Sequence, residues 1–254
     1  MKTGSSYRWL VVLFFLVVST GRVHATPSTT YWTPATTDIQ PYRTLHIGID
    51  DYFTVFKKGE NKGSFPTDAG LTLGILPFDK VQAEVGVDFM EPQDDPFMFN
   101  AKIGTPEDIW FKGSPALNVG IFNAGTRRDV TNFNIVDVII GKTIPMLGRL
   151  FVGAYIGNNS TLVDGDGDAD NKGFMIGMDR GFWSVKNKAG GEYNRLVFAA
   201  DWASGKNYIG GGGAGLYYYF TKYISLLTGP VFFNDKTING EWKWTTQFDI
   251  NIPF

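Results

Sequence analysis

Apolar and polar residues alternate with a period of two along most of this chain, and that pattern constrains its fold more than any other feature. The alternation is regular in the stretch 79–89, where the apolar positions are Val81, Ala83, Val85, Val87 and Phe89, and the intervening ones are Lys80, Gln82, Glu84, Gly86 and Asp88. Successive side chains of a strand point to opposite faces, so this stretch is predicted to be a strand with one apolar face.

The same alternation, or a less regular form of it, recurs from end to end. Short links such as Pro77-Phe78 favour antiparallel hairpins between consecutive segments. The sequence therefore predicts an all-β domain over residues 42–254, a single antiparallel up-and-down barrel of about twelve strands. The predicted strands are 44–55, 68–75, 79–89, 97–103, 117–121, 134–144, 150–156, 173–185, 196–202, 209–220, 222–233 and 243–254.

The first 25 residues have the pattern of a secretory signal peptide. Lys2 and Arg8 precede the apolar run 9–18, and the stretch ends in Val23-His24-Ala25, a small-residue cleavage pattern. An apolar helix of that length would cover about 15 Å, half of a hydrocarbon core of about 30 Å. We therefore expect residues 1–25 to be removed and the mature chain to begin at Thr26.

Residues 26–41 precede the first predicted strand and are rich in threonine. Two placements are open for this segment: it could lie in the periplasm, or it could fold into the lumen as a plug. The long links 57–66, 125–133, 158–172 and 234–241 alternate with short ones, as in membrane barrels that place long loops outside. The link 105–113, with Trp110 and Phe111, is an exception because it falls on the short-turn side.

Alternation alone does not separate a soluble barrel from a membrane barrel. Many glycines on the polar faces favour a crowded lumen over a solvated surface. Aromatic residues also gather at both predicted strand ends, which resembles interfacial girdles. The outer group is Tyr52, Phe53, Phe56, Trp202, Tyr208, Phe232, Phe233, Trp242 and Trp244, and the inner group is Phe78, Trp183, Tyr219, Phe220 and Tyr223. A soluble exported β-protein remains the alternative.

The last predicted strand carries the most specific signal. Phe248, Ile250, Ile252 and the terminal Phe254 occupy every second position. This pattern resembles the closing strand of Gram-negative outer-membrane β-barrel proteins, which commonly end in Phe. The resemblance implies location in the cell outer membrane, contact with its lipids, and recognition by the outer-membrane assembly machinery. Pro253 departs from the pattern because it removes one backbone donor. No subfamily is indicated.

The predicted lumen carries charges of both signs, which are tolerable only if they are paired or wet. Its basic residues are Lys80, Lys102, Arg149, Arg195 and Lys243, and its acidic residues are Asp50, Asp68, Glu84, Asp88, Asp137, Asp179, Asp201 and Asp249. The interior of a twelve-stranded barrel is wider than that of an eight-stranded barrel, which side chains fill, and narrower than that of a sixteen-stranded barrel, which holds an aqueous channel. The sequence leaves open whether the lumen is a narrow pore or is closed internally.

Few residues in the chain could carry out chemistry. There is no cysteine, and His46 is the one histidine after the signal peptide, so a histidine-rich metal site and a cysteine nucleophile are excluded. Asp50, on the same face of the strand, is about 13 Å away from His46 at ~3.3 Å per residue. We therefore expect no catalytic residue, no enzyme activity and no cofactor.

The predicted outer loop 158–172 contains Asp164, Asp166, Asp168 and Asp170, which resemble the first half of an EF-hand calcium loop. Ala169 stands where the turn glycine belongs and Met175 where the bidentate glutamate belongs. The four aspartates are therefore either weak calcium candidates or a solvated acidic loop tip.

The function expected from these features is a narrow, porin-like passive channel for small polar solutes or ions. A non-conducting surface barrel that presents loops for binding or adhesion is the alternative, and a barrel enzyme is a third. The balance of 23 basic and 25 acidic residues gives no nucleic-acid footprint. The oligomeric state and the transported solute are not indicated by the sequence.

Overall fold

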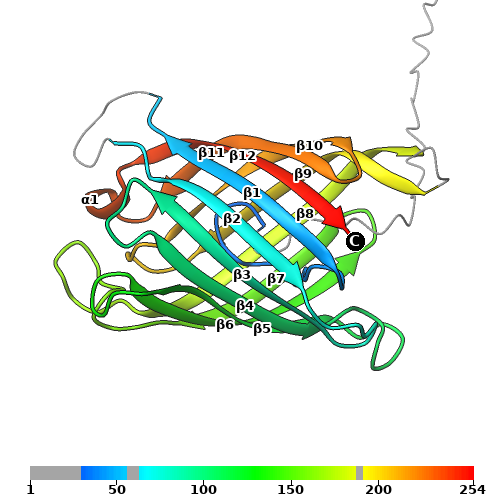
Figure 1. The fold of residues 1–254 in the computed structure, drawn as a ribbon, viewed down its shortest axis with the longest axis horizontal. Coiled ribbons are helices and arrows are strands. Elements are labelled where there is room, and N and C mark those ends of the chain that lie inside the picture. The colour runs from blue at the N-terminus through cyan, green and yellow to red at the C-terminus, as the bar shows by residue number, and fades with distance from the viewer. Residues whose placement is uncertain (1–29, 56–62, 187–190) are drawn as a thin grey trace, which may run out of the picture.

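The structure is a computed structural model that describes residues 30–55, 63–186 and 191–254. The signal peptide prediction for 1–25 lies outside these residues. In the described part, twelve strands form one closed antiparallel barrel in which consecutive strands pair and β1 pairs with β12 (Figure 1). The predicted fold class, strand number and up-and-down order are confirmed. No helix among the described residues is long and apolar enough to cross a membrane.

The strand bounds follow the alternating stretches of the sequence to within a few residues. The strands are β1 Thr44–Phe53, β2 Thr67–Gly74, β3 Gln82–Glu91, β4 Phe97–Thr105, β5 Ala116–Gly125, β6 Asn132–Ile144, β7 Gly148–Ile156, β8 Lys172–Lys186, β9 Glu192–Ala203, β10 Gly211–Thr221, β11 Ile224–Phe233 and β12 Trp242–Pro253. The short helix α1, Lys236–Asn239, lies between the last two strands.

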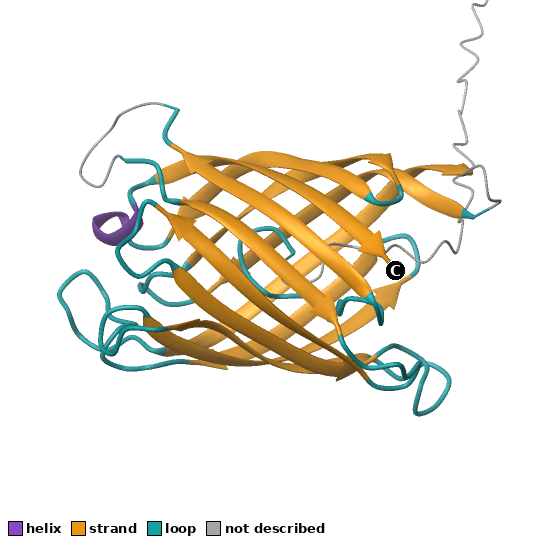
Figure 2. Cartoon of the chain, viewed as in Figure 1, coloured by secondary structure: helices purple, strands orange, loops and turns teal. Residues whose placement is uncertain are grey.

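The two ends of the barrel differ. The even-numbered strands finish at the end of the barrel that holds the C-terminus, which we call the turn end. The odd-numbered strands finish at the opposite end, the loop end, where the link 157–171 and α1 lie (Figure 2). The link 106–115 between β4 and β5 lies at the turn end, where Trp110 is 69% and Phe111 67% exposed.

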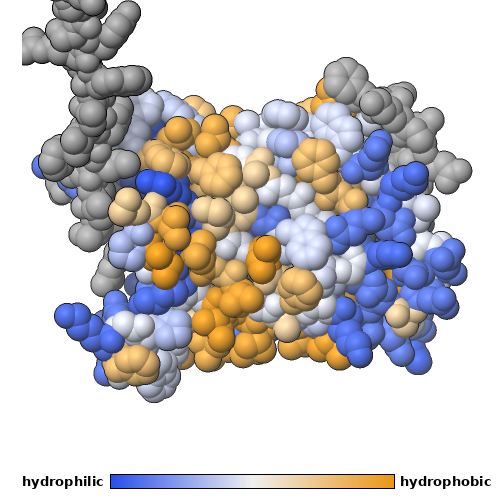
Figure 3. Space-filling model, turned by 180° about the vertical axis from the view of Figure 1, so that it is seen from behind, coloured by the Kyte–Doolittle hydropathy of each residue, from blue (hydrophilic) through white to orange (hydrophobic). Residues whose placement is uncertain are grey.

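Apolar side chains cover the outside of the barrel wall. In the face shown by Figure 3 they gather over the middle of the strands, and hydrophilic residues dominate the loop end. Among the exposed apolar residues at outward strand positions are Val85, Val138, Ile140, Val152, Ile176 and Leu216. The alternation in the sequence therefore separates an apolar exterior from the interior of the barrel.

The interior is packed, and two apolar clusters line one side of it. One cluster includes Ile135, Ile139, Phe151 and Met175, and another includes Val197, Tyr217, Leu227 and Val231. These residues belong to β6–β11 and point inward. Close packing of this kind leaves little room for solvent along that side of the lumen.

Candidate functional site: the lumen and its N-terminal segment

The candidate site is the lumen together with residues 30–41, which we call the lumen segment. The segment runs inside the barrel before β1 begins and is drawn in blue within the ring of strands (Figure 1). Tyr31 and Ala35 are fully buried. The threonine hydroxyl of Thr30 donates to the carbonyl of Ala35 at 2.7 Å, so the segment reverses direction within the lumen.

The carboxylate of Asp201, on β9, holds the turn of the lumen segment. It accepts hydrogen bonds from three consecutive backbone N–H groups, those of Tyr31 at 2.9 Å, Trp32 at 2.9 Å and Thr33 at 2.8 Å. Such charge-assisted bonds are about twice as strong as neutral ones. Asp201, which the sequence assigns to the lumen, therefore binds the backbone of the chain's own N-terminal segment.

Glycines in the wall make room for the segment. The ring of Tyr31 lies where side chains of β10 would otherwise point, and a Cβ on Gly213 or Gly215 would come 2.5 Å from its ring carbons. A Cβ on Gly177 would similarly meet the carbonyl oxygen of Ala35 at 2.5 Å. The crowded lumen that the glycines indicated is crowded in part by the chain's own N-terminal segment.

Trp32 extends from the turn toward the loop end of the lumen. Its ring makes edge contacts with Tyr52 at 5.1 Å and Phe233 at 5.2 Å between centroids. Its indole N–H donates to the carbonyl of Ile209 at 2.9 Å. Phe65 and Tyr208 complete this aromatic layer. An amphipathic ring with its N–H satisfied closes the lumen at this level.

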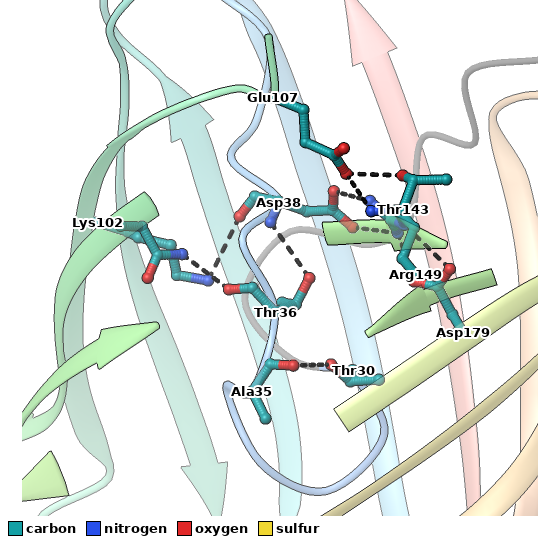
Figure 4. Close-up of polar contacts among 10 residues, drawn as sticks. Thr30, Ala35, Thr36, Asp38, Lys102, Glu107, Thr143, Arg149 and Asp179 are labelled. Atoms are coloured by element: carbon teal, nitrogen blue, oxygen red, sulfur yellow. Dashed lines mark hydrogen bonds and ion pairs between the residues drawn. The ribbon is translucent and has the colours of Figure 1, made fainter. Parts of the chain in front are cut away.

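A charged cluster anchors the other end of the segment (Figure 4). The guanidinium of Arg149, on β7, donates to Asp38 of the segment at 2.7 Å and to Asp179 of β8 at 2.9 Å. Lys102 donates to the carbonyl of Asp38 at 3.4 Å. Asn118 donates to the carbonyl of Thr36 at 2.7 Å. Lumen charges thus bind the segment from several strands.

The segment leaves the barrel at the turn end beside a pocket of about 220 Å³. The backbone N–H of Gln40 donates to Glu84 at 2.7 Å, and the Gln40 amide donates to Asn251 at 2.9 Å. Asp38, Gln40 and Asn251 also line the pocket, together with Tyr193 and Tyr219. This pocket is an opening into the lumen that the segment borders.

Most of the charged residues assigned to the lumen by sequence do face inward. Glu84, Lys102, Asp179, Asp201, Lys243 and Asp249 are all buried on inward positions, and Asp88 and Arg149 are half-buried there. Lys243 donates to the carbonyl of Gly63 at 2.7 Å.

Two of those assignments need correction. Lys80 is exposed in the link between β2 and β3, because the predicted strand 79–89 begins only at Gln82. Arg195 lies near the turn end of β9, where its guanidinium covers the ring of Trp183 at 5.4 Å. It therefore belongs to the rim of the barrel rather than to the inner lumen.

Several aromatics assigned to the interfacial girdles also face inward. Tyr52, Tyr208 and Phe233 pack around Trp32, and Tyr219 is 5% exposed within the lumen. Phe53 and Phe232 remain on the outside, and Phe56 lies outside the described residues. Aromatic side chains at the strand ends point to the lumen in some cases and to the outside in others. Their position along a strand therefore does not predict which of the two they face.

His46 has an acidic neighbour on the adjacent strand that a search along its own strand missed. Pairing of β1 with β12 brings its Nε2 to 3.6 Å from Asp249 Oδ1, and Nδ1 to 3.2 Å from Asn251. The hydroxyl of Ser225 donates to Asp249 rather than to the histidine. His46 is 8% exposed and Ser225 1% exposed. A hydroxyl that donates to the carboxylate instead of to the imidazole lacks the geometry of an activated nucleophile.

The four aspartates of the acidic loop do not converge. Asp164 Oδ1 accepts from the backbone N–H groups of Asp166 and Asp168, each at 3.0 Å. Asp170 instead accepts from the backbone N–H of Lys206 at 2.5 Å. Within the described residues no three acidic or histidine side chains are placed to hold a metal ion. The carboxylates of Asp164 and Asp170 therefore accept hydrogen bonds from backbone N–H groups and stabilise the loop conformation.

The terminal strand presents the residues of the predicted assembly signal outward. Phe248, Ile250 and Ile252 alternate with the buried or half-buried Gln247, Asp249 and Asn251. Phe254 is 63% exposed, and its backbone N–H donates to the carbonyl of Arg43 at 3.0 Å. Backbone pairing at the terminus thus continues past Pro253.

Comparison with known proteins identifies the fold. No protein-family model and no curated protein sequence matches this chain. The NanC porin structure is 8% identical with a TM-score of 0.51, over 82% of this chain and 100% of that one. A membrane protein from work on in-meso crystallization is 11% identical with a TM-score of 0.50, over 84% of each chain.

A mutant porin of Rh. blastica is 11% identical with a TM-score of 0.41, and the match covers 73% of this chain. The chain spans 55% of the length of that porin, and at this TM-score the likeness carries no weight. The likeness to the NanC porin structure shows that the chain has a closed β-barrel of porin-like fold.

Proposed function

We propose that this chain is a porin-like channel of the bacterial outer membrane in which the lumen segment closes the pore. Displacement of the segment admits small polar solutes or ions. The loop end then faces outward and the turn end faces the periplasm. The exposed apolar exterior supports a membrane location, because such a surface needs contact with lipid. Separation of inner and outer membranes after expression tests that location.

The observation that carries this proposal is the binding of the segment by lumen charges. Asp201 accepts from three backbone N–H groups, and Arg149 joins Asp38 to Asp179. Water can replace such hydrogen bonds one for one, so their net contribution is modest compared with burial of an apolar core. The pocket beside Gln40 gives water access to the segment from the turn end.

Single-channel recording in planar bilayers tests the gate. The mature wild-type barrel should open rarely, and Asp201→Asn should raise the open probability about tenfold or more, since a bond to a charged group contributes ~1.5–3 kcal/mol. Asp129→Asn, an exposed change at the loop end, is the matched control and should behave as wild type. Complete silence of folded wild-type and Asp201→Asn barrels would contradict the channel role.

A second candidate is a non-conducting barrel that presents its loops for binding or adhesion. The apolar clusters on the inner faces of β6–β11 favour it, because they fill one side of the lumen and include Ala35 and Tyr31 of the segment. Silence in the same recordings would favour this role.

Neither role requires an enzyme or a cofactor. The arrangement of Ser225, Asp249 and His46 supports this, because the hydroxyl and imidazole do not face one another. Retention of every measured activity in His46→Ala is the expected result.

A further inference from the structure

Four lumen carboxylates stand on neighbouring strands at one side of the barrel. Asp249 of β12, Asp50 of β1, Asp68 of β2 and Asp88 of β3 lie on the inner faces of consecutive strands, and we call them the acidic wall. Asp50 pairs in register with Asp68. The charges of Asp249, Asp68 and Asp88 all act on Asp50. The four form one electrostatic group.

The floor of the acidic wall is bare backbone. Gly48 is the register partner of both Asp249 and Gly70, and Gly70 is the partner of Asp88. A Cβ on Gly70 would lie 2.9 Å from Asp88 Oδ1, and one on Gly48 would lie 3.7 Å from Asp249 Oδ1. The carboxylate of Asp88 therefore leans over Gly70, and at Gly48 the imidazole of His46 lies beside Asp249, with Nε2 3.2 Å from the position of a Cβ.

In the part of the chain that the structure describes, no lysine or arginine pairs with this wall, and the basic group beside it is His46, whose Nε2 lies 3.6 Å from Asp249 Oδ1. Within the described residues, no lysine or arginine nitrogen lies within 4.0 Å of these four carboxylates, and Lys102 and Arg149 pair with Glu84 and Asp179 instead. The lumen segment 30–41 brings only one charged residue, Asp38, which is itself acidic. Asp68 Oδ1 is buried and has no hydrogen-bond partner among the described residues.

Carboxylates so placed need water or cations around them. They do not converge tightly enough for three of them to hold a metal ion. Weak, multiple attraction is what permits an ion to enter and leave again. From this geometry we infer that the solute admitted to the lumen is a cation, and that the acidic wall forms its path. This inference rests on the proposed channel function.

The first test is the reversal potential in a KCl gradient, with the pore opened by Tyr31→Ala, which changes no charge. Potassium should permeate about fivefold or more over chloride, as expected for a path lined by carboxylates. Asp50→Asn with Asp68→Asn and Asp88→Asn should bring the ratio close to one. The matched control neutralises three exposed acids at the loop end, Asp94, Asp129 and Asp166, and should keep the preference.

The second measurement is thermal unfolding of the full wild-type mature chain in KCl and in N-methyl-D-glucamine chloride at equal ionic strength. Potassium should raise the midpoint over the bulky cation, and the triple lumen variant should lose this difference. Conductance without cation preference, or with a preference unchanged in the triple variant, overturns the inference and leaves the channel standing. If no variant conducts, the channel role is wrong, and the thermal unfolding measurement then tests whether cations enter the lumen. A higher unfolding midpoint in potassium supports the inference, and equal midpoints in the two salts overturn it.

Discussion

Tyr31 fills the space beside Gly213, where a Cβ would come 2.5 Å from its Cε1 atom. Its hydroxyl donates to the carbonyl of Pro230 at 3.1 Å. The ring thus fills the space that side chains of β10 would occupy if Gly213 and Gly215 were larger residues. It also packs into the apolar cluster of β9–β11 and so joins the N-terminal segment to it.

Removal of this ring should unseat the segment while the strands stay paired. Tyr31→Ala is expected to cost about 3–5 kcal/mol of stability, the usual range for loss of a buried aromatic ring. Tyr31→Phe loses only one hydrogen bond and should cost about 1 kcal/mol. Denaturant unfolding gives these values, and recordings should show frequent openings for Tyr31→Ala alone. Equal open probabilities of Tyr31→Ala and Tyr31→Phe would contradict the proposal that the Tyr31 ring holds the segment in the lumen.

The bridge from Asp38 through Arg149 to Asp179 should be worth more than an exposed ion pair. Arg149→Met leaves two carboxylates inside the lumen without their partner, and we expect a loss of about 3–5 kcal/mol. Arg127→Met is the control, because Arg127 and Asp95 form an exposed pair at 3.1 Å. Its loss should stay below about 1 kcal/mol. Similar losses for both variants would show that the bridge does not anchor the segment.

Asp235 should make the loop around α1 sensitive to acid. The hydroxyl and backbone N–H of Thr237 and the N–H of Gly165 hold the pKa of Asp235 below its ordinary value. A depressed pKa in the folded state stabilises the loop above the unfolded pKa, and this stability is lost as pH falls through the folded value. The protection of the Thr237 and Gly165 amides against exchange, relative to their intrinsic rates, should therefore fall below about pH 4. Asp235→Ala should exchange rapidly at all pH values.

Trp110 and Phe111 should lie at the lipid interface of the turn end. The link 106–115 is held against β6, because Glu107 accepts from the backbone N–H of Thr143 at 2.7 Å and pairs with Lys142 at 2.8 Å. Amphipathic aromatic rings favour the membrane interface. Brominated lipids should quench a fluorescence component that Trp110→Phe removes. Quenching that is equal in both proteins would place this link in water.

Deletion of Phe254 should impair insertion by the outer-membrane assembly machinery without abolishing refolding in detergent. The ring is 63% exposed, so its loss costs the folded barrel little. Insertion into membranes that contain the machinery is the measurement, with Tyr42→Ala, another exposed aromatic near the turn end, as the control. Normal insertion of the deleted chain would exclude Phe254 from recognition.

Local alternation predicted the strands because each strand has an outward apolar face, so period two survives even where the inward face varies. It did not predict which aromatics turn inward. In β6, Ile135 and Ile139 face the lumen while Val136, Val138 and Ile140 face outward, and both sets are apolar. Period two carries no information when both faces are alike.

The lumen segment left a weaker trace in the sequence. Contacts such as Tyr31 with Gly213 or Trp32 with Asp201 join residues far apart in the chain, and periodicity describes neighbours only. The signal available was indirect: two aromatic residues, Tyr31 and Trp32, precede the first strand of a chain whose predicted lumen is rich in glycine. A segment with that composition matches a glycine-rich wall.

Strands β6–β11 carry apolar side chains on both faces, so we expect them to tolerate fewer substitutions than the other strands. Strands that contribute no residue to the two buried apolar clusters, such as β2 and β3, can exchange lumen residues without loss of a packed core. Strands such as β10 and β11 are constrained on both faces, and nearly every position there resists replacement. Natural variation and engineering of the bore should therefore concentrate on one side of the wall, and new specificities would arise there first.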